Sequence, residues 1–200
     1  MTPDAAMSTD ATFPTLHTAR LRLREITAAD VPALFAIHGD AQAMRWFGAD
    51  PLTEPAQAAQ LVAVFAAWRQ MPHPGTRWGL VRQDTGDFIG SCGLFKWNRG
   101  WGSCTIGYEL ARSAWGQGYM DEALRAILDW GFEHMALRRV EAQVHPQNTA
   151  SLKLLARLGF ATEGLLREAG FWGGQAEDLV ALGLLGREWV SARVSGTGVT

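Results

Sequence analysis

The chain has 200 residues, of which 48% are hydrophobic, and its 18 basic and 20 acidic side chains give a net charge of −2. This charge provides no broad basic surface for nucleic acid, and no apolar run reaches the ~20 residues of a membrane-spanning helix. The first fifteen residues lack the basic start and apolar stretch of a secretion signal, so we expect a cytoplasmic protein without a direct nucleic-acid or membrane partner. We expect one domain over residues 16–189, with flexible tails at 1–15 and 190–200.

Hydrophobic periodicity divides the chain into alternating strands and helices. In chain order we predict a strand at 20–26, a helix starting after Thr27, a helix at about 54–71, strands at 76–83, 88–97 and 103–110, a helix at about 119–134, a strand at 140–145, a helix at 148–158, and strands at 160–167 and 179–185. Thr27 and Asp30 form a capping-box pattern, and Thr53 is the expected cap of the second helix. The pattern predicts an α/β (α+β) fold.

Two cysteines, Cys92 and Cys104, fall in separate predicted strands without C-x-x-C spacing. So few cysteines favour neither a disulfide framework nor a zinc site. We therefore expect core thiols and no bound metal.

The most informative segment is the turn between the strand at 103–110 and the helix that follows it, which contains Gly116 and Gly118. Glycine adopts backbone angles closed to other residues, so consecutive N–H groups can converge on an anion at the helix start. The P-loop pattern is excluded because Tyr119 and Met120 follow the second glycine, and the dinucleotide pattern because residue 121 is Asp. A phosphate site and a tight connection without a ligand both fit the turn alone.

The turn and four further motifs resemble the GNAT superfamily of acyl-CoA-dependent N-acyltransferases over residues 16–189. The motifs are Ile106-Gly-Tyr-Glu-Leu110 leading into Trp115-Gly-Gln-Gly-Tyr119, then Asn148-Thr-Ala-Ser151, Arg157-Leu-Gly-Phe160, and Asp178 with Leu185-Gly-Arg-Glu-Trp189. They look like the branch that contains the ribosomal-protein N-terminal alanine and serine acetyltransferases. The chain departs from the superfamily pattern at Ser113, where Gln or Arg is usual, which affects a side-chain contact but not the backbone turn.

The resemblance implies a GNAT fold with a mixed, mostly antiparallel sheet that splays between its fourth and fifth strands, with acetyl-CoA as cosubstrate in the opening. The pantetheine arm would bond to exposed main-chain groups much as an added strand does. The implied contacts are main-chain groups of Leu110 and Arg112 for the arm, N–H groups of Gly116, Gln117, Gly118, Tyr119 and Met120 for the pyrophosphate, and Asn148 and Ser151 for the pantetheine end. For Asn148 alone, a helix cap is the stronger interpretation.

The resemblance also implies direct attack of a neutral amine on the thioester, aided by alignment and by polarisation of the carbonyl. Many members carry a tyrosine proton donor where this chain has Leu155. The ribosomal branch instead uses the serine at Ser151, which we expect to hydrogen-bond the leaving thiolate, and a serine bonded only within its own helix is the alternative.

The proton acceptor follows less directly from the sequence. Positions that carry an acid in relatives are Gln143 and Gly170 here. We rank Glu109 first, acting through water, because its strand borders the cleft. The alternatives are Glu141, His145 and Glu168, and each of the four can also be an ordinary surface or loop residue.

Family geometry places the aromatic pairs Trp46-Phe47 and Phe171-Trp172 beside the acceptor. We expect N-acetylation of a protein or peptide N-terminal amine. A small-molecule amine (a polyamine, amino acid or antibiotic) and a non-catalytic acyl-CoA-binding module are the alternatives, because fold alone does not fix the acceptor. The sequence leaves the oligomeric state open, a homodimer included.

Overall fold

The computed structural model describes residues 12–189. In chain order its elements are β1 (Leu16–His17), β2 (Leu21–Glu25), α1 (Val31–His38), α2 (Ala41–Met44), α3 (Pro55–Trp68), β3 (Thr76–Arg82), β4 (Phe88–Asn98), β5 (Ser103–Leu110), α4 (Tyr119–His134), β6 (Arg139–Val144), α5 (Thr149–Arg157), β7 (Ala161–Trp172) and β8 (Gln175–Leu185). Short 3-10 turns cover Ala28–Asp30 and Arg112–Ala114.

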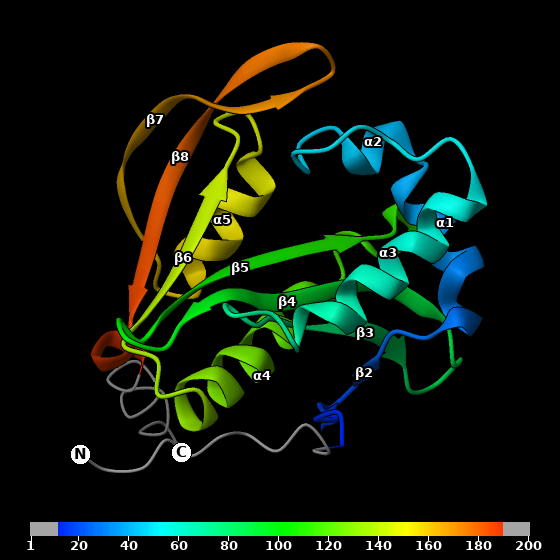
Figure 1. Ribbon diagram of the computed structural model, residues 1–200, viewed down its shortest axis with the longest axis horizontal. Coiled ribbons are helices and arrows are strands. Elements are labelled where there is room, and N and C mark those ends of the chain that lie inside the picture. Colours follow the sequence, from blue (N-terminus) through cyan, green and yellow to red (C-terminus); the bar gives the residue numbers. More distant parts are fainter. Residues whose placement is uncertain (1–11, 190–200) are drawn as a thin grey trace.

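The strands form one sheet of eight in the order β1-β2-β3-β4-β5-β6-β8-β7. Every neighbouring pair is antiparallel except β5 and β6, which are parallel. The parallel pairing joins only Ser103–Thr105 to Arg139–Glu141. Beyond it the two strands diverge, as Figure 1 shows, which confirms the predicted splay.

Helices cover both faces of the sheet because alternate strand residues point to opposite sides. On one face the main core gathers strand residues with α4 and α5. One stripe of α4 is buried there: Met120, Ala123, Leu124, Ile127, Leu128, Gly131. On the other face a smaller core joins α1 and α3 through Leu34, Ala58 and Phe65. The hairpin of β7 and β8 curls over this second face toward α2 (Figure 1).

The cysteine prediction is confirmed, because Cys92 and Cys104 are buried and free. Burial raises the pKa of the Cys104 thiol to about 12 and raises that of Cys92 further. Both thiols therefore stay protonated and behave as small core side chains.

Several boundaries differ from the sequence predictions. The cap of α3 is Glu54 rather than Thr53, because Gln57 Oε1 accepts hydrogen bonds from both of their backbone N–H groups. The short elements β1 and α2 carry too few residues to show a period and were not predicted. Both strands of the last hairpin are longer than expected and meet at a turn of Gly173 and Gly174.

The N-terminal boundary also differs. Residues 1–11 and 190–200, which make up most of the predicted tails, lie outside the described residues. Within the predicted tail 1–15, however, the Pro14 carbonyl accepts a 2.6 Å hydrogen bond from the Trp78 indole. The Phe13 ring also packs edge-on against Trp78, with ring centres 5.9 Å apart. The packed part of the chain therefore begins before Leu16.

The predicted capping box at the entrance to α1 is confirmed and reinforced by an ion pair. Asp30 accepts a 2.8 Å bond from the Thr27 N–H and two 2.7 Å bonds from the Arg24 guanidinium. Burial raises the pKa of Asp30, but these hydrogen bonds outweigh it and hold the pKa below its usual value. The ionised form of Asp30 thus ties β2 to the start of α1.

We predict that Asp30→Asn lowers the free energy of unfolding by about 1–3 kcal/mol at pH 7, the range for a hydrogen bond to a charged group. Because the pKa is lowered in the fold, the contribution of Asp30 is present above its unfolded value of about 3.9 and is lost as pH falls through the folded value. The difference between wild type and variant should therefore shrink below about pH 4. Urea unfolding across this range measures it, with Asp84→Asn as control, since Asp84 pairs with Arg82 in an exposed turn. A difference that persists undiminished at low pH would contradict the assignment.

Candidate active site

The glycine turn has the backbone conformation that the sequence predicted. Gly116 and Gly118 have φ values of 73° and 79°, and Gly118 is the N-cap of α4. A Cβ on Gly116 would meet nothing within 4 Å, and one on Gly118 only Arg20 Nη2 at 3.5 Å. Glycine is therefore required here by conformation rather than by crowding, and the space beside the turn is open for an anion.

Two arginines lie beside this turn, and each is paired with a carboxylate, Arg20 with Glu122 and Arg82 with Asp84. The Arg20 guanidinium lies 4.5 Å from the centre of the Tyr119 ring and donates a 2.9 Å hydrogen bond to the Gln117 carbonyl. An adjoining pocket of about 450 Å³ is lined in part by Arg82, Ser113, Gln117 and Tyr119. The open N–H groups at the helix start, rather than free positive charge, suit a pyrophosphate. The Met120 side chain is buried in the core, so only its N–H belongs to this turn.

Leu110 and Arg112 lie between the end of β5 and the glycine turn, where the sequence placed them. The Leu110 carbonyl accepts a 2.9 Å hydrogen bond from the Trp115 indole. The Arg112 side chain turns away to α2, where it pairs with Asp40 and donates a 2.8 Å bond to Gln42. Arg112 therefore fixes the position of α2 relative to the end of β5, in addition to any main-chain role.

Asn148 and Ser151 lie together at the start of α5, which follows β6. Asn148 Oδ1 accepts a 3.1 Å hydrogen bond from the Ser151 N–H, so the interpretation as a helix cap is confirmed. Leu155 is completely buried in the main core. The half-buried Ser151 side chain lies beside the Tyr108 hydroxyl.

Glu109, which we rank first from the sequence as a proton acceptor acting through water, is buried in an ion pair. Its side chain is 2% exposed and pairs with Arg77, which is 3% exposed. The Ser91 hydroxyl donates to the same carboxylate, and His38 Nε2 lies 3.4 Å from Oε1. Burial raises the pKa of Glu109, but Arg77, His38 and Ser91 outweigh it and lower the pKa. A carboxylate so stabilised is a weak base by itself.

The three alternative proton acceptors, Glu141, Glu168 and His145, lie in different parts of the structure. Glu141 pairs with Arg139 and lines a separate pocket of about 390 Å³ at the far end of β5. Glu168 is exposed on a bulge of β7, with φ at 51°. His145 accepts a 3.1 Å bond from the Gln147 N–H at Nδ1, so its Nε2 carries the proton and donates to Glu177 at 3.1 Å. Both of its nitrogens are thus engaged.

Three of the four predicted acceptor aromatics gather around two histidines on the α1 face. Trp46 stacks on His145 with ring centres 4.1 Å apart, and Trp172 meets His145 edge-on at 6.1 Å. Phe47 packs edge-on against His38 at 5.2 Å.

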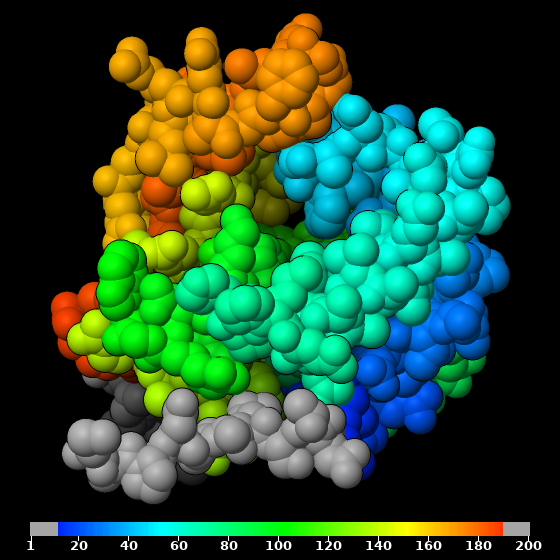
Figure 2. All heavy atoms as spheres, viewed as in Figure 1, coloured from blue at the N-terminus to red at the C-terminus, as the bar shows by residue number. Residues whose placement is uncertain are grey.

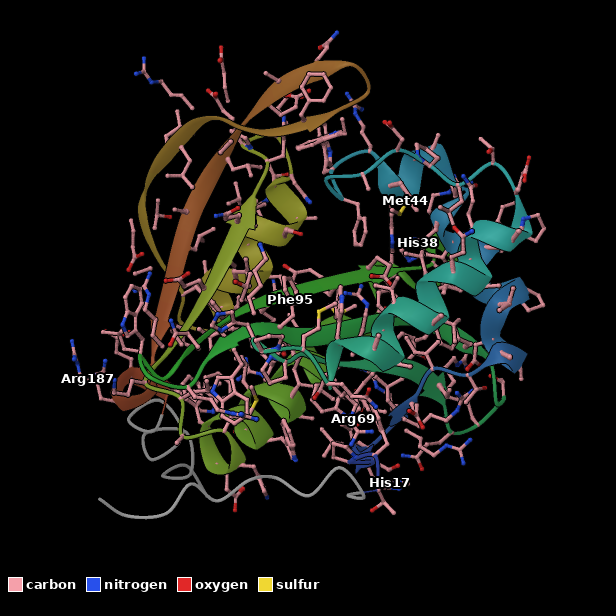
Figure 3. All side chains as sticks on the ribbon, viewed as in Figure 1. His17, His38, Met44, Arg69, Phe95 and Arg187 are labelled. Atoms are coloured by element: carbon pink, nitrogen blue, oxygen red, sulfur yellow. The ribbon has the colours of Figure 1, made fainter. Side chains whose placement is uncertain are left out.

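A hollow opens between the β7–β8 hairpin, the segment after α2, and β5 (Figure 2). His38 is the last residue of α1 and lies near the end of β5 (Figure 3). The Gly173 N–H donates a 2.7 Å bond to Asp50, which links the hairpin tip to the segment after α2.

Phe171 does not join this group, contrary to its sequence assignment. Its side chain is 72% exposed, because neighbouring residues of a strand point to opposite faces and Trp172 takes the inner one. The position of Trp172 also explains why residue 170 is a glycine. A Cβ there would lie 2.3 Å from the Trp172 ring, so Trp172 occupies the space that an acidic side chain would need.

Sequence reasoning missed His38, Arg77, Ser91 and Tyr108 as site residues. A signal was available for two of them, because Arg77 and Ser91 are polar residues within otherwise buried strands, and Ser91 pairs directly with Glu109. His38 showed only as a histidine on the apolar face of a predicted helix. Tyr108 appears only as a member of the motif Ile106-Gly-Tyr-Glu-Leu110.

The chain belongs to the GNAT acetyltransferase family: the model of the "Acetyltransferase (GNAT) domain" matches residues 20–161. An uncharacterized N-acetyltransferase of Bacillus licheniformis, p20, is 34% identical over 175 residues, which cover 88% of this chain and 98% of that protein. The chain is thus an acetyl-CoA-dependent acetyltransferase, and the predicted family, fold and cosubstrate are confirmed.

Two further similarities concern different acceptors. The ribosomal protein uS5-alanine N-acetyltransferase of Escherichia coli is 33% identical over 116 residues, or 58% of this chain and 60% of that protein. A spermidine N-acetyltransferase of Vibrio cholerae, solved with CoA and spermine, superposes with a TM-score of 0.74 at 19% identity over 85% of this chain and 98% of that one. The second similarity shows the fold alone.

No helix within residues 12–189 is long and apolar enough to cross a membrane. The same range contains no cluster of three or more histidine, cysteine or acidic side chains able to hold a metal ion.

We predict that Gly118→Val weakens CoA binding at least tenfold in a folded protein, since the new side chain enters the open space beside the turn and disturbs its N–H groups. Gly86→Val is the matched control, because Gly86 has a φ of 78° and equally open surroundings in the β3–β4 turn. Both variants should lose a similar ~1–2 kcal/mol of stability through backbone strain. Calorimetry with CoA measures affinity; equal affinities in the two variants would remove the turn from the site.

Proposed function

We propose that this acetyltransferase acetylates the N-terminal amine of a protein or peptide. The observation that carries the acceptor class is the aromatic lining of the hollow, where Trp46 and Trp172 pack on His145 and Phe47 packs on His38. A single amine followed by a small apolar side chain suits an aromatic-lined hollow. Glu109 is buried against Arg77, so it does not offer a free carboxylate to a second ammonium group.

The similarity to the uS5-alanine acetyltransferase supports the same acceptor class, and a ribosomal-protein acceptor would place the reaction in the cytoplasm. Acetyl-CoA would lie with its pyrophosphate on the N–H groups of residues 116–120 and its pantetheine arm between β5 and β6. The arm would meet main-chain groups of Leu110 and Arg112 and the side chain of Asn148. Its thioester would then face the hollow from the opposite side of the sheet.

Ser151 is placed at the thioester end of this arm, where its hydroxyl hydrogen-bonds the leaving sulfur. The Asn148 cap holds the backbone N–H of Ser151, which fixes the first turn of α5 and leaves the hydroxyl for this contact. A serine hydroxyl is a poor acid, so it acts as a hydrogen-bond donor rather than as the source of the proton.

The amine proton passes to the pair of His38 and Glu109, with a water between amine and imidazole. His38 accepts the proton, and the Glu109 carboxylate at 3.4 Å stabilises the imidazolium that forms. Little base strength is needed because an α-amine has a pKa of about 8, so a useful fraction is neutral near pH 7.

Thiol release from acetyl-CoA with a matched panel of acceptors tests the proposed function. We expect peptides that begin with alanine or serine to be turned over at least tenfold more efficiently, by kcat/KM, than spermidine, free amino acids or aminoglycosides. Peptides whose N-terminus is already acetylated are the control, because only their side-chain amines can still react. A preference for a polyamine or other metabolite would overturn the acceptor class and leave acetyl transfer intact.

We predict that His38→Gln lowers kcat/KM most where the pH lies below the pKa of the amine. Activity should recover as the pH rises past about 8, because the neutral amine then becomes abundant. His38→Gln is the primary test because it keeps the Arg77–Glu109 pair. Glu109→Gln should give the same pH profile together with lower stability, since it leaves Arg77 buried without its counter-ion.

The exposed His134, which stacks on Trp130 in α4, supplies the control substitution His134→Gln. This control should match wild type at every pH. A loss in His38→Gln that does not vary with pH would move the role to another group or to solvent.

A further inference from the structure

Tyr108 carries a buried hydroxyl that makes no hydrogen bond of normal geometry within residues 12–189, although the Ser151 side chain lies close enough to interact with it weakly. It lies on β5, beyond Thr105, the last residue of that strand to pair with β6. Leaving a buried hydroxyl unsatisfied costs about 1–3 kcal/mol, and buried polar groups in proteins almost always have a partner. A hydroxyl buried where the sheet opens therefore points to a ligand atom that completes its bonding.

The Ser151 side chain lies beside the Tyr108 hydroxyl. It lies close enough to the phenol to lower its pKa, while burial, the larger effect, raises that pKa to about 12. Tyr108 thus keeps its proton at neutral pH and can only donate or accept hydrogen bonds. The two hydroxyls come from opposite sides of the opening, one from β5 and one from the helix that follows β6.

We propose that the Tyr108 hydroxyl donates a second hydrogen bond, beside Ser151, to the sulfur atom of the acetyl-CoA thioester. This inference rests on the proposed positions of the pantetheine arm and of Ser151. As the amine nitrogen bonds to the carbonyl carbon, the carbon–sulfur bond breaks and its electron pair moves to the sulfur. The amine proton goes to His38, and the thiolate is protonated by solvent after it leaves.

The phenol acts as a donor and not as an acid. Proton transfer from a phenol with a pKa of about 12 to a thiolate whose conjugate thiol has a pKa near 8.5 would be unfavourable, because the two pKa values differ by about 3.5. A hydrogen bond to the developing charge needs no such transfer and is stronger to the thiolate than to the thioester, so it favours the step that breaks the carbon–sulfur bond.

The test uses Tyr108→Phe, which removes one oxygen. We expect kcat to fall about 10- to 100-fold, the value of one hydrogen bond to a charged atom, with little change in KM for acetyl-CoA. Calorimetry above the thiol pKa should show weaker binding of CoA but unchanged binding of desulfo-CoA, which lacks the sulfur. Thermal stability without CoA should be unchanged or higher, because an unsatisfied hydroxyl is lost.

Trp97→Phe is the matched control, because the Trp97 indole N–H is also buried without a partner but lies near the other end of the β4–β5 pair. It should leave kcat and both affinities unchanged. The double variant Tyr108→Phe with Ser151→Ala should lose less than the product of the two single losses, since both groups act on one atom.

Equal losses of CoA and desulfo-CoA affinity would make Tyr108 a packing or arm contact, and an unchanged kcat would remove it from the reaction; either result overturns the inference. A second measurement needs no variant: the pKa of the CoA thiol bound to wild type should lie below that of free CoA, and an unchanged or raised value also overturns it. Wild type that releases no thiol with any amine would instead count against the proposed function.

Discussion

The short parallel pairing of β5 with β6 is the constraint on which the site depends. Hydrogen bonds join the two strands over three residues on each side and then stop. Main-chain groups on the facing edges beyond that point need other partners, and a ligand with its own amides can supply them. The chain leaves both strands at this open end: β5 leads into the glycine turn and α4, and β6 leads to Asn148 and α5. Two helix N-termini therefore lie beside one opening, with no side-chain cap on α4 and the Asn148 cap on α5.

The other face of the sheet is organised by the buried pair of Glu109 and Arg77. Desolvation costs several kcal/mol for each ion, so the pair is stable only because further hydrogen bonds complete it. Arg77 Nε donates to Ser91 at 2.7 Å, and Ser91 donates to the carboxylate. These contacts come from β3, β4 and β5, and His38 adds α1. The cluster thus joins the floor of the acceptor hollow to the helix that carries the proposed proton acceptor.

The sequence predicted most elements of this fold because long amphipathic segments determine their own structure. The helix predicted at about 119–134 and the conformations of Gly116 and Gly118 depend on local sequence, and both match the structure. The partners of Glu109 could not be predicted in the same way, because Ser91 and Arg77 are 18 and 32 residues away along the chain. Their pairing follows from the register of three strands. Phe171 was misplaced for a related reason: β7 shifts register between Leu166 and Gly170, which decides the faces that the following residues occupy.

The alternation of side chains between the two faces of β5 links the two halves of the proposed reaction. Tyr108 and Glu109 are consecutive, so their side chains must lie on opposite faces of the sheet. Tyr108 faces the side of α5 and Ser151, where negative charge develops on sulfur, and Glu109 faces the side of His38, where positive charge develops on the amine. Separate groups thus stabilise the two charges, with the opening between them. A slip of one residue in β5 would exchange these two side chains, so the antiparallel register of β5 with β4, which pairs Ser91 with Glu109, is as necessary to the chemistry as the groups themselves.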